Sequence, residues 1–271
     1  MPLIALTRPV PESLTRCELT HLSRVPIDLH AARAQHAEYE RALEALGCEV
    51  RPLPAADDHP DSVFVEDAAI VLDELAIITR PGAISRRGET MAIAAELSRY
   101  RRLQWISEPA TLDGGDVLRL DRTLYVGVGS RTNEAAVAQL LEIVQPFDYD
   151  VRAVRVTACL HLKSAVTELA VDLVLLNPDW VDPTTFANQR QIEVDPLEPA
   201  AANVLRIGDT VLCSASYERT RRRIEAVGIR HHSIDGSELA KAEGGLTCCS
   251  LIFEEPSQWR ARRATPRREI A

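Results

Sequence analysis

The chain repeats one order of elements five times, and this repetition restricts the folds open to it. Three copies are clear, and each places a short apolar strand before a polar turn and an amphipathic helix. Their strands are Leu75–Thr79, Leu124–Val128 and Thr210–Ser214, and their helices cover 89–100, 133–144 and the run up to Val227. Two weaker copies begin at Leu3–Leu6 and Leu173–Leu176, with helices expected near 31–46 and 184–188.

Two further extended stretches follow the helix of every copy. The first set comes directly after the helices, at 49–51, 103–106, 151–156, 191–194 and 229–234. The second set completes the copies, at Val63 onward, 116–118, 165–166, 202–205 and Cys248 onward. The chain therefore predicts five strand–helix–strand–strand units with centres roughly 40–55 residues apart, the period range of propellers and arrays. A doubly wound parallel sheet is the competing architecture, but the strands are too many and too short for it.

Composition limits the partners of the protein. A net charge of −9 over 271 residues argues against nucleic-acid binding and favours cationic partners. No apolar run is long enough to span a bilayer, so no membrane partner is expected. No signal peptide is seen and the six cysteines form no disulfide framework, which predicts reduced thiols in a cytoplasmic protein. We expect one domain over residues 1–253 and a disordered, Arg-rich tail over 254–271.

Polar residues recur at one phase of the repeat, just before or within the last strand of each copy. They are Glu66 with Asp67, then Asp113, His161, Asn203 and Cys248. The spacings from Asp67 onward are 46, 48, 42 and 45 residues. In a closed ring of five units, equivalent positions lie around one axis, so these side chains would converge on one site. The shared phase favours an enzyme, because an unrelated set of surface residues would not follow the repeat.

The residue types suggest a reaction at a cationic carbon. Cys248 follows two glycines at a loop-to-strand junction and could attack as a thiolate. His161 could exchange protons near neutral pH, with Asp113 orienting its ring. Glu66 and Asp67 in a water-poor centre call for a cation, and a guanidinium matches carboxylates bidentately.

Other interpretations remain open for each residue alone. Free cysteines and a histidine flanked by leucines are commonly core residues, and Asp113–Asp116 alone is commonly a turn. Lys163 is expected to point to solvent. A zinc site built from the cysteine, histidine and carboxylates ranks lower, because no paired His or Cys motif fixes a metal.

Strings from all five copies resemble the dimethylarginine dimethylaminohydrolases, of the guanidine-modifying superfamily. They run in family order over about residues 1–253 and are Phe64–Asp67, Ile78–Ala83 with Ser85–Arg87, Ala110–Leu118, Ser130–Asn133, Leu160–Ser164, Ala201–Asn203 and Leu246–Ser250. The resemblance implies a five-bladed pseudo-symmetric α/β propeller. It also implies hydrolysis of asymmetric dimethylarginine and monomethylarginine to citrulline and an amine, through a thiouronium on the cysteine.

The resemblance also assigns roles to individual residues. It makes Cys248 the nucleophile, His161 the general acid and then base, and Asp113 its carboxylate partner. The implied substrate contacts are Glu66 and Asp67 at the guanidinium, Arg86 and Arg131 at the α-carboxylate, Asp61 and the Leu19 backbone at the α-amino end, and the Ala242 backbone in the site wall. No cofactor is implied, the partner is a small cationic guanidine, and a homodimer paired along blade edges is one of the assemblies expected.

Two other functions stay open at this point. A deiminase or amidinotransferase would act on arginine or another guanidine through the same residue types. A propeller that only binds its ligand would lack this chemistry, and the complete set of Cys248, His161 and Asp113 argues against it.

Overall fold

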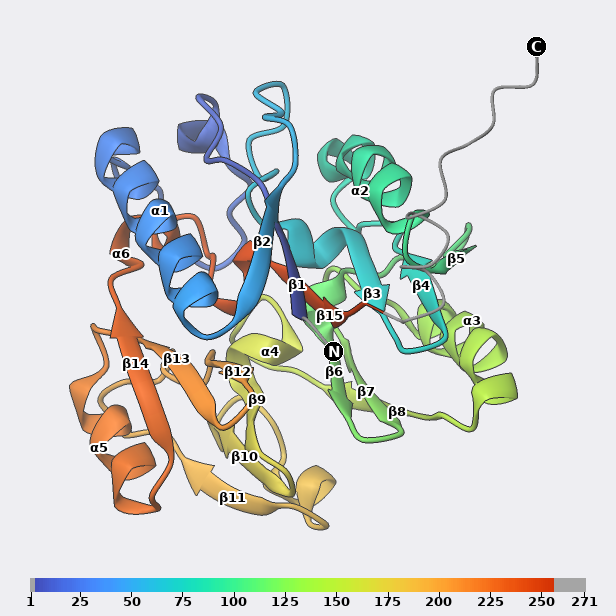
Figure 1. Cartoon of the computed structure of the whole chain (residues 1–271). Helices are drawn as coiled ribbons and strands as arrows, with labels where there is room; N and C mark the ends of the chain where they lie inside the picture. Colours follow the sequence, from blue (N-terminus) through green and yellow to red (C-terminus); the bar gives the residue numbers. More distant parts are fainter. Residues whose placement is uncertain (1–2, 256–271) are drawn as a thin grey trace.

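Five small sheets of three strands each make up the described part of the chain, residues 3–255 of the computed structural model (Figure 1). In every sheet the central strand pairs antiparallel with one neighbour and parallel with the other. The sheets, each with its central strand second, are β15 (Leu251–Glu254), β1 (Leu3–Thr7) and β2 (Cys48–Pro52); β3 (Ala69–Val71), β4 (Leu75–Ile78) and β5 (Arg102–Trp105); β6 (Val117–Leu120), β7 (Thr123–Val128) and β8 (Asp150–Arg155); β9 (Val166–Ala170), β10 (Leu173–Leu176) and β11 (Arg190–Glu193); β12 (Leu205–Ile207), β13 (Thr210–Ser214) and β14 (Arg230–Ile234).

The third sheet shows why the sequence folds this way. A tight turn with Asp121 at φ 52° joins β6 and β7 as a hairpin, and the crossover from β7 to its parallel partner β8 runs through helix α3 (Glu134–Val144). Asn133 caps this helix by accepting a hydrogen bond from the backbone N–H of Ala136. The folding unit is therefore strand–strand–helix–strand.

The observed grouping of strands into sheets differs from the predicted grouping by one strand per unit. The strand expected to end each copy pairs instead with the first strand of the next copy, through the polar turns at 73–74, 121–122 and 208–209. Residues close in sequence form hairpins at low entropic cost, and the strand order alone does not show which neighbour a short strand will join. The competing doubly wound sheet is excluded for the described residues, since each sheet holds three strands of mixed direction.

The helices occupy the expected positions. Those between the parallel strands are α1 (Leu29–Ala45), α2 (Thr90–Leu97), α3 and α5 (Glu218–Ala226), and in the fourth unit the short turn η6 (Pro183–Phe186) takes this place. Two shorter helices of the described chain, α4 (Leu162–Ala165) and α6 (Ser237–Ala240), lie outside these crossovers. Gly47 and Gly228 take positive φ values of 93° and 81° after α1 and α5, as expected for helix C-caps. No helix in residues 3–255 is both long and apolar enough to cross a membrane.

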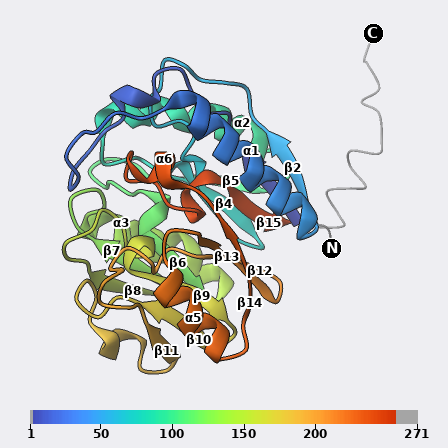
Figure 2. The same ribbon diagram turned by 90° about the vertical axis from the view of Figure 1, so that its left-hand side faces the viewer.

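The hydrophobic core is divided among the junctions between sheets. One cluster, for example, combines Ile4 of β1 and Phe253 of β15 with Ile78 of β4 and Leu97 of α2. The other clusters likewise combine neighbouring sheets, so each sheet is packed against its neighbour. Figure 1 shows the units following one another around the molecule, and Figure 2, turned by 90°, shows α1 and α5 on the side that faces the viewer.

The two ends of the described chain meet in one sheet. Strand β15 pairs antiparallel with β1, with Phe253 opposite Ile4. Glu254 ends this strand and Glu255 is buried, so the ordered chain reaches past the predicted end of the domain at 253. The rest of the predicted tail, 256–271, lies outside the described residues, and the domain assignment stays a prediction.

Candidate active site

Short helical turns just before β3, β6, β9 and β15 hold or begin at half of the candidate residues. Together with β12 these are the innermost strands, since β15 lies against β3, and β9 lies against β6 and β12. Turn η2 (Val65–Ala68) precedes β3 and holds Glu66 and Asp67, and η7 (Thr247–Cys249) precedes β15 and holds the candidate nucleophile. Asp113 and His161 are the N-cap residues of η4 (Gly114–Asp116) and α4 (Leu162–Ala165). The segments at Val63 and Cys248, predicted as strands, are therefore turns, and their strands begin at Ala69 and Leu251.

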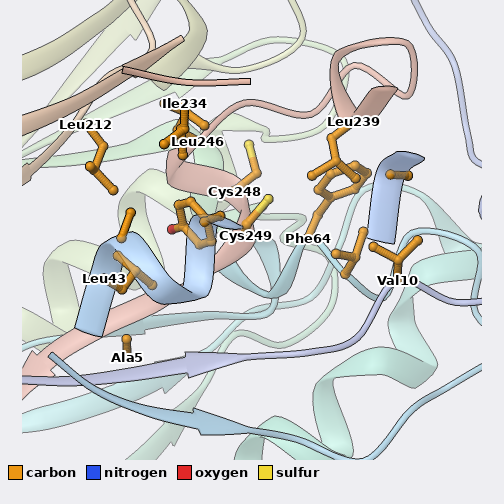
Figure 3. Packing of buried hydrophobic residues seen from close by; sticks show 14 of the residues in the cluster. Ala5, Val10, Leu43, Phe64, Leu212, Ile234, Leu239, Leu246, Cys248 and Cys249 are labelled. Atoms are coloured by element: carbon orange, nitrogen blue, oxygen red, sulfur yellow. The ribbon is translucent and has the colours of Figure 1, made fainter. Parts of the chain in front are cut away.

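Cys248 and Cys249 are both buried but have different surroundings. Cys248 lines a small cavity, and its Sγ accepts a hydrogen bond from the Gly245 N–H at 3.3 Å. The Sγ of Cys249 faces the Gly245 carbonyl at 3.6 Å, and Cys249 does not line this cavity. Both cysteines belong to the hydrophobic cluster with α1 and β13 side chains that Figure 3 shows. Burial, followed by the charges of Glu66 and Asp67, raises the pKa of Cys248 well above its ordinary value. The resting thiol is therefore neutral.

His161 lies between two carboxylates. Its Nε2 is 3.1 Å from Asp113 Oδ2, and its Nδ1 is 3.7 Å from Asp67 Oδ1. Burial lowers the pKa of His161, but the Asp67 charge and the hydrogen bond to Asp113 outweigh burial and raise it to about 9. The imidazole is therefore protonated at neutral pH and carries a proton that it can donate.

Asp67 is held in its charged form by its neighbours. Its Oδ2 accepts from Arg86 Nη1 at 2.5 Å, and its Oδ1 accepts from the Gly115 N–H at 3.0 Å. Burial raises the pKa of Asp67, but the charges of His161 and Arg86 outweigh burial and lower it to about 2. A permanent negative charge thus lies beside the cavity.

Arg86 is buried and most of its donors are used within the protein. Besides Asp67, it donates to both carboxylate oxygens of Glu89 and to the carbonyls of Asp61 and Phe64. Arg131 is less committed. Within residues 3–255 its guanidinium donates to Thr20 Oγ1 at 3.1 Å and lies 3.9 Å from Asp113 Oδ2. Of the two arginines predicted at the α-carboxylate, Arg131 has the more available donors.

Glu66 contacts the nucleophile turn, which is η7 with Cys248. Its Oε1 accepts from Lys163 Nζ at 2.6 Å, and its Oε2 accepts from Thr247 Oγ1 at 2.7 Å. The expectation that Lys163 points to solvent is wrong, because Glu66 offers it a buried ion-pair partner that the sequence does not reveal. Glu66 borders a second cavity on the side of the innermost strands.

The described residues that line the cavity at Cys248 include Glu18, in the loop that contains Leu19, but not Leu19 itself, Glu66 or Asp113. Its lining residues in the described chain are Glu18, Asp61, Phe64, Asp67, Arg86, Arg131, Leu160, His161, Ala242, Glu243, Gly244 and Cys248. Asp61 accepts from the Glu18 N–H at 3.3 and 3.1 Å and so holds the residue before Leu19. Burial raises the pKa of Asp61 to about 6 despite the nearby Arg86 charge.

Sequence reasoning missed two residues that hold this arrangement. Glu243 accepts hydrogen bonds from the backbone N–H groups of Thr20, His21 and Leu22, in the loop that contains Leu19. Asp116 accepts from Thr132 Oγ1 at 2.6 Å and from the Leu162 N–H at 3.0 Å, and so fixes the residue after His161. The Asp-Gly-Gly-Asp motif contained the signal for Asp116, whereas a loop glutamate such as Glu243 gives none.

Asp67, Asp113 and His161 are also close enough to bind a metal ion, with ligand atoms within 4.8 Å of one another. The hydrogen bonds that these residues already make favour a proton-transfer site over a metal site. Asp113 accepts from the Gly82 N–H at 2.8 Å, and Asp67 is paired with a guanidinium. A second cation bound there would face Arg86 at short range.

Fold and site together define a class: an α/β protein of five small sheets with a thiol, an imidazole and carboxylates around one cavity. A family model described as N,N dimethylarginine dimethylhydrolase, eukaryotic, matches residues 23–207. The dimethylarginine dimethylaminohydrolase of Streptomyces coelicolor is 41% identical over 253 residues, which is 93% of this chain and 97% of the relative. The enzyme of the same name from Pseudomonas aeruginosa is 36% identical, over 83% and 90% of the two chains.

Solved structures agree with this result. A cysteine-to-serine variant of the Pseudomonas aeruginosa enzyme in complex with citrulline superposes with a TM-score of 0.88 at 34% identity, over 92% of this chain and 98% of that chain. A histidine-to-glycine variant of a dimethylarginine dimethylaminohydrolase, as an adduct with S-methyl-L-thiocitrulline, gives the same TM-score and identity, over 93% and 100%. The chain belongs to the dimethylarginine dimethylaminohydrolase family.

Proposed function

We propose that this protein hydrolyses Nω-methylated arginines to citrulline and methylamine or dimethylamine. The observation that carries the proposal is that Cys248, a protonated His161 and an ionised Asp67 line one cavity in a chain of this family. Citrulline and S-methyl-L-thiocitrulline in the related structures fit a reaction at the guanidine carbon.

The first step is attack by sulfur on that carbon. Because burial keeps the pKa of Cys248 high, the thiol loses its proton to the solvent only when the cationic guanidinium lies beside it and offsets the charges of Glu66 and Asp67. Addition of Sγ builds a tetrahedral centre. Its collapse expels the amine, which takes the His161 proton, and leaves a thiouronium on Cys248.

The second step releases the product. His161, now neutral, removes a proton from a water molecule that adds to the thiouronium carbon. The C–S bond then breaks, the sulfur takes up the remaining hydroxyl proton, and citrulline and the resting Cys248 thiol are formed. Asp113 holds the ring through its 3.1 Å contact and stabilises the imidazolium in both steps. The general acid of the first half-reaction is thus the general base of the second.

The amino-acid end of the substrate binds at the opposite side of the cavity. We assign Arg131 to the α-carboxylate because its guanidinium has the fewer protein partners of the two arginines. We assign the α-ammonium to Asp61, which lines the cavity, and to the backbone of Leu19, which follows the lining residue Glu18, and we assign the Ala242 backbone to the cavity wall. Arg86 serves mainly to keep Asp67 ionised, and Glu66 supports the nucleophile turn.

The architecture proposed for the whole chain is a five-bladed α/β propeller. Pairing of β15 with β1, and the closeness of β15 to β3, β6 to β9 and β9 to β12, support a closed ring of units. Convergence of turns from four units on one cavity supports it as well. The expected homodimer and the cytoplasmic location remain predictions.

Steady-state assays of citrulline release test the proposal. We expect release from asymmetric dimethylarginine and monomethylarginine, loss of at least about 1,000-fold in Cys248→Ser, and near-normal rates in Cys249→Ser. Release mainly from unmethylated arginine would make the protein a deiminase. A folded protein that releases citrulline from none of the three would refute a hydrolytic role on these substrates.

A further inference from the structure

Asn203 shares the repeat phase of the site residues, yet the reaction steps above do not use it. It stands before β12, in the unit between those that carry His161 and Cys248. Its side chain is half-buried and lies against the backbone of Gly245, where an added Cβ would come within 2.5 Å of Asn203 Oδ1. The same glycine donates its N–H to the nucleophilic sulfur.

Both the oxygen and the nitrogen of the Asn203 side-chain amide form hydrogen bonds with the nucleophile turn. Its Oδ1 accepts from the Thr247 N–H at 3.1 Å, while its Nδ2 donates to Thr247 Oγ1 at 3.1 Å and to the Lys163 carbonyl at 3.0 Å. Thr247 precedes Cys248 and so has both its backbone and its hydroxyl fixed by one side chain. The turn η7 has only three residues, too few for internal hydrogen bonds to define its position.

These contacts close into a ring. Thr247 Oγ1 donates to Glu66 Oε2, Glu66 Oε1 accepts from Lys163 Nζ, and the Lys163 carbonyl accepts from Asn203. Lys163 stands two residues after His161 on α4. The ring therefore ties the histidine-bearing turn to the cysteine-bearing turn with hydrogen bonds of 2.6 to 3.1 Å.

We propose that Asn203 is a positioning residue, which, with Thr247, Glu66 and Lys163, sets Cys248 Sγ against the guanidine carbon and against His161. The proposal rests on the proposed hydrolase function. Misplacing a reacting atom by about 1 Å can reduce a rate about 100-fold, and none of these contacts is to the amino-acid end of the substrate. Loss of the ring should therefore lower kcat and leave KM nearly unchanged.

The test uses Asn203→Ala and Thr247→Val, with Thr247→Ser as the conservative variant. We expect kcat for asymmetric dimethylarginine to fall about 10- to 100-fold in the first two, with KM within about threefold, and Thr247→Ser to stay near the wild type. Labelling of Cys248 by 2-chloroacetamidine should slow by a similar factor. Thr220→Val is the matched control. Thr220 is buried and its hydroxyl accepts a hydrogen bond from the Asp195 N–H, but it does not line the cavity.

A double-mutant cycle gives the sharpest outcome. If Asn203 and Thr247 act as one unit, Asn203→Ala/Thr247→Val will lose about as much kcat as either single variant. Three results would overturn the proposal. They are additive losses, folded single variants whose kcat and labelling stay within about twofold of the wild type, and unfolding of both single variants. An inactive wild type whose Cys248 still reacts with the amidine would instead refute the proposed function.

Discussion

Neighbouring charges set the protonation states of Cys248 and His161 within one cavity. The thiol is kept neutral by burial and by Glu66 and Asp67, and the same carboxylate, Asp67, helps to keep the imidazole protonated. The sequence indicated which residue types would meet, because the repeat phase brings them together. It could not show that Arg86 is committed to Asp67 and Glu89, or that Lys163 turns inward, because these pairings depend on side-chain directions at close packing.

The charge of His161 should be visible in the pH dependence of stability. Its pKa in the folded protein, about 9, is above the ordinary value of 6.5, so the stabilisation is complete below pH 6.5 and is lost as the pH rises through 9. We expect the free energy of unfolding of the wild type to fall by roughly 2–3 kcal/mol more than that of His161→Gln between pH 6.5 and 9.5. Urea titrations of both proteins measure this, and parallel curves would contradict the assigned charge state.

Arg131 should contribute to substrate binding more than to the chemical step. Arg131→Ala removes the cation assigned to the α-carboxylate, so we expect KM to rise roughly 10- to 100-fold with a small change in kcat. The exposed Arg230, which pairs with Asp209 at 3.4 Å, provides Arg230→Ala as the control. A large fall in kcat with unchanged KM would show that Arg131 acts through Asp113 instead.

At the scale of elements, the helices could be predicted and the turns of the site could not. Amphipathic spacing and the Asn133 cap define α3, and Gly47 and Gly228 end α1 and α5 at positive φ. The site turns have three or four residues each, and their apolar neighbours read as the starts of strands.

Turn η4 allows a direct test of this close fit. A Cβ on Gly115 would lie 2.7 Å from His161 Nδ1 and 2.8 Å from Asp67 Oδ1. Gly115→Ala should therefore displace the imidazole and lower kcat by about 100-fold or more while the protein stays folded. Gly129→Ala is the control, since its added Cβ meets no atom within 4 Å, and equal activity of the two variants would show that the ring has room to move.

At the scale of the whole molecule, the strand order could be predicted but the partners of each strand could not. Recognising five repeats gave the number of units, yet the hairpins join strands across the predicted copy boundaries. The pairing of β15 with β1 links residues about 250 positions apart, a contact that no local pattern reports. Core clusters shared between neighbouring sheets make the units depend on one another.

Phe253 tests that dependence. It is buried, lies opposite Ile4 and packs edge-on to Tyr100 at 5.2 Å, so Phe253→Ala should cost about 3–5 kcal/mol. If the units unfold together, exposure of the Cys213 thiol in the fifth sheet should shift to lower urea by as much as the circular dichroism signal does. Leu197→Ala, at a side chain 72% exposed, should shift neither, and an unchanged Cys213 transition would show that the units unfold separately.

The most direct test of the account is to trap the covalent intermediate. The reaction with asymmetric dimethylarginine would be quenched in acid after milliseconds to seconds and the protein analysed by mass spectrometry. We predict an adduct with the mass of the substrate less dimethylamine, located on Cys248 by fragmentation, present in Cys249→Ser and absent in Cys248→Ser. An adduct on Cys249, or citrulline formed by Cys248→Ser at the wild-type rate, would contradict the assignment of the nucleophile.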